Sequence, residues 1–153
     1  KKIDGIRADS GKLILSSNTI SSCSRAIILS SKVKGTVYPN TFKKNTYNNV
    51  KVNSSYVNTL TVKSLSGKSK SAKTATLNWK KLSSASGYVV YRSASKNGSY
   101  TKISTIKKNK TITYKDSKLK RKSTYYYKIV PYTTIGKTTV YGLDSKIVSI
   151  KIK

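Results

Sequence analysis

Residues 85–93 read ASGYVVYRS and decide the fold of this chain. Side chains of a strand alternate between the two faces of a sheet, so Tyr88 and Val90 point one way while Val89 and Tyr91 point the other. Similar short runs, rich in Val, Ile, Thr and Tyr, recur along the chain between clusters of Ser, Asn, Gly and Lys. No segment has the sustained apolar period of about 3.6 residues that indicates a helix. This pattern predicts an all-β protein.

The expected strands follow one another at intervals of roughly 8–12 residues, with turns between them, which is typical of a two-sheet sandwich. They are 12–16, 26–29, 34–38, 50–52, 60–65, 74–79, 87–92, 100–106, 111–114, 124–130, 138–141 and 146–152. Residues 66–73, SGKSKSAK, are expected to form a charged loop after a first sandwich strand. A linker between two domains is a second interpretation of this segment.

Alternation within these strands predicts which side chains form the core. The expected inward-facing residues are Leu77, Trp79, Tyr88, Val90, Tyr125, Tyr127, Ile129, Val148, Ile150 and Ile152. Two sheets packed face to face would bury these residues between them. Each large side chain that becomes fully buried stabilises the fold by roughly 1.5–3 kcal/mol.

From about residue 57 the sequence resembles fibronectin type III domains, in particular the Lys-rich domains of surface and secreted proteins of Gram-positive bacteria. The resembling segments are TLNW at 76–79, ASGYVVYRS at 85–93, SKNGSY at 95–100, TYKD at 113–116 and LKRKSTY at 119–125. Lys122 departs from the pattern, because Gly is common at its position. The resemblance implies an Ig-like sandwich in which the Tyr125 hydroxyl bonds to the backbone near Leu119, as a tyrosine corner.

Residues 1–56 are rich in Ser and Asn and contain short apolar runs at 13–15 and 27–29. Three interpretations remain open for them: the end of a preceding module, a small β-rich cap, or strands added to the sandwich. We therefore expect two regions, a β-rich segment of unassigned family at 1–56 and a fibronectin type III-like β-sandwich at 57–153.

The charge of the chain is extreme, with 32 Lys and Arg against 4 acidic residues and a net charge of +28. A protein this basic is attracted to polyanions. Lys greatly outnumbers Arg, and Lys suits diffuse neutralisation of charge better than bidentate reading of bases. We expect an anionic polymer such as wall teichoic acid as the partner, and no sequence-specific binding of nucleic acid. A solubilising surface without a partner is the alternative.

The chain offers little for catalysis, since it has no His and no Glu, and its four Asp residues are dispersed. A single Cys, at position 23, makes neither an internal disulfide nor a zinc cluster. We expect no catalytic residues, no cofactor and no metal site. No stretch has the apolar length of a transmembrane helix.

Two surface features are candidates for binding. The first is a face of aromatic, aliphatic and basic residues, opposite the core on two strands that should be neighbours: Val89, Tyr91, Tyr126, Lys128, Val130 and Tyr132. Simple cross-strand packing is its alternative interpretation. The second is an anion-binding rim formed by loop cations, expected to converge at one end of the sandwich: Lys107, Lys108, Lys110, Lys115, Lys118, Lys120, Arg121 and Lys122.

The leading functional interpretation is a non-catalytic extracellular or cell-surface module that binds or spaces and adheres to anionic wall polymer. A competing interpretation is a structural subunit that self-assembles into a filament, surface layer or phage-like appendage. In that case a strand such as 26–29 would add to the sheet edge of another chain. A non-specific nucleic-acid binder and an accessory domain of a secreted enzyme are two further interpretations.

Overall fold

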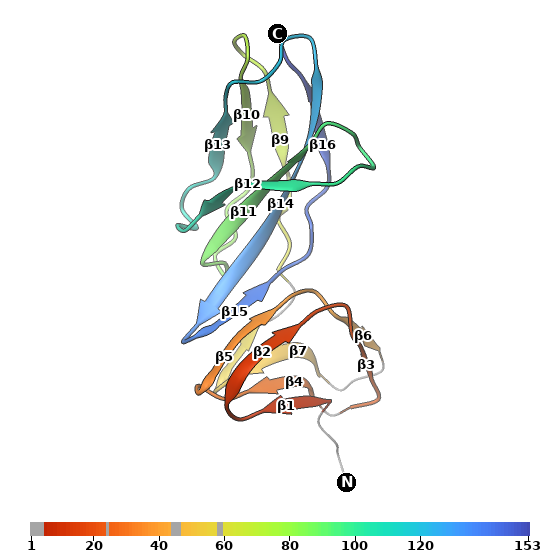
Figure 1. The fold of residues 1–153 in the computed structure, drawn as a ribbon. Helices are drawn as coiled ribbons and strands as arrows, with labels where there is room; N and C mark the ends of the chain where they lie inside the picture. Colours follow the sequence, from red (N-terminus) through yellow and green to blue (C-terminus); the bar gives the residue numbers. More distant parts are fainter. Residues whose placement is uncertain (1–4, 24, 44–46, 58–59) are drawn as a thin grey trace. The chain divides into compact units, whose positions relative to one another are not determined.

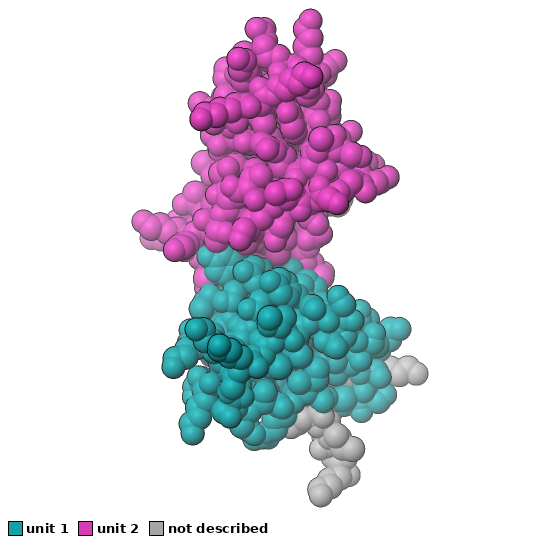
Figure 2. Space-filling model, in the orientation of Figure 1, with its two compact units in different colours: residues 1–60, 132–142 teal, residues 61–131, 143–153 magenta. Residues whose placement is uncertain are grey.

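The computed structural model describes residues 5–23, 25–43, 47–57 and 60–153, and these residues form strands, turns and irregular segments without a helix (Figure 1). The prediction of an all-β fold is therefore confirmed. The chain groups into two compact units, coloured separately in Figure 2. Unit 1 contains residues 1–60 and 132–142, and unit 2 contains residues 61–131 and 143–153. The grouping of 132–142 with the N-terminal region was not anticipated from the sequence.

Unit 2 is a β-sandwich. One of its sheets is antiparallel and has the order β13-β10-β9, and the other joins β12, β11, β14 and β16. The strands are β9 (Ser66–Lys68), β10 (Ala75–Asn78), β11 (Gly87–Ser93), β12 (Thr101–Ile106), β13 (Thr113–Asp116), β14 (Thr124–Ile135) and β16 (Val148–Lys151).

The core of unit 2 lies between these two sheets. Trp79 retains only 4% of its surface exposed, and its ring meets the ring of Tyr88 edge to face with the centroids 5.4 Å apart. All the residues expected to face inward lie in this core or pack against it; Tyr125 and Val148 are its partly buried members. The predicted core is thus confirmed.

The tyrosine corner is also confirmed. The backbone N–H of Lys120 donates to the hydroxyl of Tyr125, with a nitrogen–oxygen distance of 3.3 Å. Lys122, between these two residues, has a φ of +60°. This left-handed backbone favours glycine, which explains why Gly is common at this position in the resembling domains.

The first strand of the sandwich lies later in the chain than expected. Residues 60–65 form no strand apart from an isolated bridge between Thr61 and Leu143, and β9 begins at Ser66. The physical reason is Ser64, whose φ of +59° interrupts the extended backbone. The expectation that 66–73 is wholly a loop is wrong for its first three residues, which pair with β10.

Unit 1 has a different architecture, built mainly from parallel strand pairs: β1 with β4, β4 with β7, β2 with β5, and β3 with β6. The strands are β1 (Ile6–Ala8), β2 (Gly11–Leu15), β3 (Thr19–Ser21), β4 (Arg25–Leu29), β5 (Val33–Val37), β6 (Thr41–Lys43), β7 (Tyr47–Val52), β8 (Ser55–Val57) and β15 (Thr138–Tyr141).

The register of these pairs shows that the chain of unit 1 winds as a solenoid. Ile6 pairs with Ile27, Gly11 pairs with Val33, and Ile27 pairs with Val50. The chain therefore returns to the same strand position after 21 to 23 residues. The first return stacks β4, β5 and β6 on β1, β2 and β3, and the second return stacks β7 on β4. Such stacking buries the side chains that point into the coil.

One side of this stack is covered by antiparallel or inserted strands. In the sheet of β1, β4 and β7, the strand β8 pairs antiparallel with β7. The strand β15 pairs parallel with β5. The buried hydroxyl of Thr138 donates to the carbonyl of Val33 at 2.9 Å and ties β15 to the solenoid. Residues 26–29 lie in β4, between β1 and β7. The idea that this strand adds to the sheet edge of another chain is therefore wrong, because both of its edges are already paired.

Candidate functional site

The predicted aromatic and basic face is divided by the structure. Its two strands, β11 and β14, are neighbours as expected. However, Val89 and Val130 are only 2% and 7% exposed, so they do not contribute a contact surface. Tyr132 belongs to unit 1, where its ring lies 5.8 Å from that of Tyr141. Tyr141 in turn stacks on Tyr38 with a centroid distance of 5.0 Å.

The remaining members of this face surround Lys128. The Lys128 ammonium lies 2.7 Å from a carboxylate oxygen of Asp144, and 5.6 Å and 4.9 Å from the ring centroids of Tyr91 and Tyr100. Tyr126 is half-buried on the same strand. Burial raises the pKa of the Tyr100 hydroxyl, and Lys128 opposes this rise. The sequence did not indicate Tyr100 or Asp144, because their approach depends on the fold.

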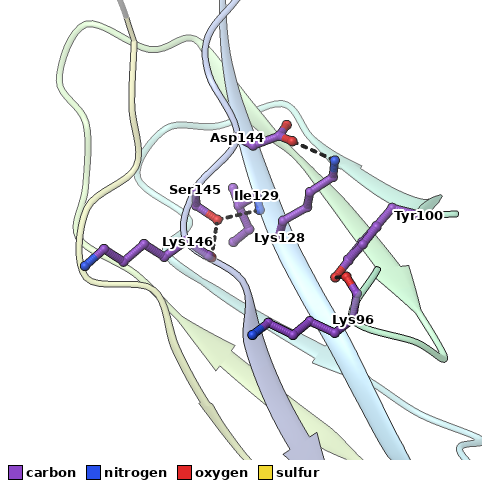
Figure 3. A network of polar contacts seen from close by, with 7 residues as sticks. All are labelled: Lys96, Tyr100, Lys128, Ile129, Asp144, Ser145 and Lys146. Atoms are coloured by element: carbon purple, nitrogen blue, oxygen red, sulfur yellow. Dashed lines mark hydrogen bonds and ion pairs between the residues drawn. The ribbon is translucent and has the colours of Figure 1, made fainter. Parts of the chain in front are cut away.

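Figure 3 shows how this cluster is held together. The Ser145 hydroxyl accepts a bond from the Ile129 N–H and donates to the Lys146 carbonyl, both at 2.9 Å. The hydroxyl of Tyr100 donates to the Lys96 carbonyl at 2.9 Å. The cation at its centre already has an acid and two aromatic rings as partners within unit 2. This arrangement favours the packing interpretation of the face over a ligand site.

The remaining described carboxylates are engaged as well. Asp116 is buried, and one of its oxygens accepts bonds from Arg92 at 2.9 Å and from the Tyr127 hydroxyl at 2.8 Å. Burial and the bond to Asp116 raise the pKa of Tyr127. Asp9 lies 3.4 Å from Arg7. Each described Asp side chain therefore faces a cation, and Asp116 is the one that is buried.

The described residues contain no group of three or more side chains of the types that hold metal ions. They also contain no helix long and apolar enough to cross a membrane.

The loop cations of the predicted rim are all exposed but lie in two separate groups. One group is in the connection from β12 to β13, the other is in the connection from β13 to β14, and Lys115 lies on β13 between them. The groups are Lys107, Lys108 and Lys110, and Lys118, Lys120, Arg121 and Lys122. Because they occupy opposite ends of β13, the structure does not bring them to one rim as expected.

The second group is joined by a lysine that the sequence analysis missed. The N–H of Leu119 donates to the carbonyl of Lys73 at 3.0 Å, and the N–H of Lys122 donates to the carbonyl of Ile152 at 2.9 Å. The loop before β10, the loop before β14 and the end of the chain thus meet at one end of unit 2 (Figure 1). A surface depression there is lined by Lys73, Lys118, Leu119, Lys120, Arg121 and Tyr125.

We call this group the basic end; it consists of Lys73, Lys118, Lys120, Arg121 and Lys122. The Lys-rich composition of residues 66–73 was a signal for Lys73, but only the fold places it beside the second loop. Three of the five members adopt left-handed backbone conformations, with φ of +60° at Lys73, Lys118 and Lys122. Such conformations cost of order 1 kcal/mol or more for a residue other than glycine.

Among solved structures, the chain is similar to a Fn3-like protein from Clostridium thermocellum, with 30% identity and a TM-score of 0.50. The similarity covers 60% of this chain and 88% of that one. This chain belongs to the fibronectin type III family. No family model and no curated protein matches the sequence.

More distant fibronectin type III structures share the fold. The sixth fibronectin type III domain of the human fibronectin type III domain containing protein 3 is 19% identical, with a TM-score of 0.51 over 63% of this chain and 87% of that one. The FN1–FN3 domains of chicken CNTN1 are 16% identical, with a TM-score of 0.52 over 74% of this chain and 35% of theirs. Fibronectin type III domains are generally non-catalytic modules, so the fold supports a binding or spacer module.

Proposed function

We propose that this chain is a non-catalytic extracellular module of a bacterial surface protein, and that its basic end binds an anionic polymer of the cell wall. The observation that carries the proposal is the left-handed backbone of Lys73, Lys118 and Lys122 at one end of the fibronectin type III domain. Glycine would relieve the strain at each of these positions. A lysine at each position instead places an ammonium group at this end of the domain, and the proposal assigns that group to anion binding.

The chemistry of the basic end fits a flexible chain of phosphates. Its cations are exposed, and every described Asp side chain is already paired elsewhere. Lys supplies three rotatable donors on a flexible stem and does not need a partner of fixed geometry. A polymer that carries one negative charge per repeat can therefore be bound in many registers, with an affinity that falls as salt rises.

Location outside the cell is part of the proposal. Fibronectin type III domains commonly occur in extracellular proteins, and this fold supports the same location here. A net charge of +28 would hold such a module against a wall rich in phosphate. Non-specific binding of nucleic acid has a similar salt dependence. Competition between DNA and purified wall polymer separates the two.

The test compares two variants that change the net charge equally. One replaces Lys118, Lys120 and Lys122 by Gln, and the control replaces the three lysines at 107, 108 and 110 by Gln. Binding to purified teichoic acid is measured by calorimetry at low and physiological salt. We expect at least a tenfold loss of affinity for the first variant and less than a threefold loss for the control. Equal losses would show that only net charge matters, and stronger competition by DNA would favour binding of nucleic acid.

A second variant separates binding from stability. Lys122→Gly relieves the left-handed backbone, so we expect it to raise the free energy of unfolding by about 0.5–1 kcal/mol while it weakens polymer binding. The same change at Lys120, whose backbone is not left-handed, is the matched control and should not stabilise the domain. A Lys122→Gly variant that binds as well as the parent would contradict a role for this lysine.

A further inference from the structure

The outer face of one sheet of unit 1 carries an ordered set of side chains. The strands β2, β5 and β15 and the last residues of β14 lie side by side in this sheet (Figure 1). Val33, Val37 and Val140 are buried, so the residues that alternate with them point to the opposite, outer face. There the pairing of the strands aligns three rows of side chains, one basic, one mostly of threonine and one aromatic.

The first row, called here the lysine row, consists of Lys12, Lys34 and Lys137. Lys12 pairs with Lys34 across β2 and β5. The N–H of Gly35 donates to the carbonyl of Lys137 at 3.4 Å, which brings Lys137 beside Lys34. All three lysines are exposed, and the ion pairs that the described residues form do not include them. Like charges on neighbouring strands repel each other, so an anion between these ammonium groups would relieve a destabilising contact.

A surface depression joins the lysine row to the second row. Thr36 is the centre of that row, because it pairs with Ile14 on one side and with Thr139 on the other. Ile14 is 74% exposed. The lining of the depression includes Ile14, Thr36, Thr139 and the three members of the lysine row. Ammonium groups, hydroxyls and an apolar side chain are therefore available to a ligand at one place.

The third row, called here the tyrosine row, consists of Tyr38, Tyr141 and Tyr132. The rings of Tyr38 and Tyr141 stack with their centroids 5.0 Å apart, and the ring of Tyr132 lies 5.8 Å from that of Tyr141. Burial raises the pKa of Tyr141, and the neighbouring hydroxyls of Tyr38 and Tyr132 raise it further. In the part of the chain that the structure describes, these three hydroxyls make no hydrogen bond. Each of them can both donate to a ligand and accept from it.

We propose that this face, from the lysine row to the tyrosine row, binds an acidic glycan. The sugar chain runs along the strands, with an acid group between the ammonium groups of the lysine row and with sugar hydroxyls on Thr36, Thr139 and the tyrosine row. The two outer rows are four residues apart, roughly 13 Å, which is enough for a short run of sugar rings. Lysine donates charge-assisted hydrogen bonds to a carboxylate or phosphate. The site lies in unit 1 and is separate from the basic end of unit 2.

A single-stranded nucleic acid fits this face less well than a glycan does. Bases bind by stacking on the open faces of aromatic rings. Tyr38 and Tyr141 use ring faces for each other, with an angle of 7° between their planes. A sugar chain instead carries many hydroxyls that need both donors and acceptors, and the threonine and tyrosine hydroxyls of this face supply both. The combination of these hydroxyls with the lysine row favours a ligand that is both polyhydroxylated and acidic.

The test titrates a trimer of galacturonic acid into the full chain and follows the backbone amides by NMR. We expect chemical shift changes in β2, β5 and β15, with β9 to β13 of unit 2 unchanged as the internal reference. A neutral galactose trimer should bind at least roughly tenfold more weakly, because it lacks the acid groups. Shift changes confined to the basic end would overturn the proposal. So would equal binding of a glycerol phosphate trimer, which has acid groups without sugar rings, or tighter binding of single-stranded DNA at this face.

Two variants with the same change of net charge show whether the lysine row itself is needed. One replaces the three members of the lysine row by Gln, and the matched control replaces the exposed lysines at 107, 108 and 110 by Gln. We expect the first variant to lose at least roughly tenfold in affinity for the galacturonic acid trimer and the control to lose less than about threefold. Equal losses would contradict a site at this face.

A third variant tests the tyrosine row. Tyr38 is 42% exposed, and Tyr38→Phe keeps its ring while it removes the hydroxyl. The loss of one hydrogen bond should weaken binding of the trimer by roughly threefold to tenfold. Unchanged binding would overturn the part that the tyrosine row has in the site. The Gln variant of the basic end should bind the trimer as the parent does, so that failure of one proposed site is distinguished from failure of the other.

Discussion

The buried cluster of Asp116, Arg92 and Tyr127 gives the most direct test of the sandwich core. The change is Asp116→Asn, which keeps the shape of the side chain and removes its charge. One carboxylate oxygen accepts both the Arg92 bond at 2.9 Å and the Tyr127 bond at 2.8 Å. The Asp116 side chain is only 8% exposed, so water cannot readily replace the lost interactions.

The magnitude follows from how exposed each partner is. A hydrogen bond to a charged group contributes roughly 1.5–3 kcal/mol, and the buried Tyr127 bond should have such a value. The Arg92 side chain is 33% exposed, and its guanidinium lies 5.4 Å from the centroid of the Tyr125 ring. Water and this ring therefore still stabilise the guanidinium when the carboxylate is removed, which reduces the cost of losing the ion pair. We therefore expect Asp116→Asn to lower the free energy of unfolding by about 2–4 kcal/mol.

The assay is equilibrium unfolding in urea, followed by the fluorescence of Trp79. This residue is the one Trp in the chain and lies in the core of unit 2, so its signal reports that unit. A loss of about 2 kcal/mol corresponds to a fall in Tm of roughly 8 °C or more for a domain of this size. Tyr127→Phe should lose less than Asp116→Asn, because it leaves the ion pair with Arg92 intact. An Asp116→Asn variant within about 0.5 kcal/mol of the parent would refute the reasoning.

Three further predictions test other parts of the structure. Trp79→Ala should lower the stability of unit 2 by about 3–5 kcal/mol in chemical denaturation followed by circular dichroism; unchanged melting would argue against its place in the core. Gly142→Ala should unfold or strongly destabilise unit 1, because the added carbon would overlap the backbone oxygen of Leu60; normal hydrogen exchange in β5 would contradict this. Burial and Asp116 raise the pKa of Tyr127, so the unfolded chain loses this proton first above pH about 10. The parent should then lose stability relative to Tyr127→Phe by up to about 1.4 kcal/mol per pH unit; parallel pH profiles would contradict it.

The sandwich could be predicted from the sequence because the pattern that identifies its core residues lies within single strands. Alternation within β10, β11, β14 and β16 identifies the inward side chains before any pairing is known. Asp116 belongs to the TYKD segment, which is one of the segments that resemble fibronectin type III domains. Its partners were not predicted, because Arg92 and Tyr127 lie 24 and 11 residues away and approach it only when two sheets pack.

The solenoid of unit 1 could not be predicted in the same way. Its strands are three to six residues long, too short for a clear alternation, and the chain completes only two full returns. The repeated corner, Asn18-Thr19 and Asn40-Thr41, was present in the sequence. A single recurrence in a chain rich in Asn and Thr carries little weight until the parallel register shows that the two corners are stacked.

Likewise, β14 was expected to end at Val130 but continues through Pro131 to Ile135. Proline has no N–H to donate, and it usually interrupts a paired strand. Here it lies between the part that pairs with β16, at 124–127, and the part that pairs with β15, at 132–135. The register of neither pair includes Pro131, so the strand continues without losing a ladder bond in those pairs.

Parallel stacking also explains where unit 1 places its charges. In a solenoid, equivalent residues of successive coils lie about 4.8 Å apart, so where both positions hold the same residue type, that side chain meets its own kind. An asparagine is suited to this, because one amide donates while the next accepts, and Asn18 and Asn40 occupy a partly buried corner. An ammonium group only donates, so the stacked pair Lys12 and Lys34 cannot satisfy itself. Both lysines are accordingly exposed, where water supplies the acceptors that the neighbouring coil lacks.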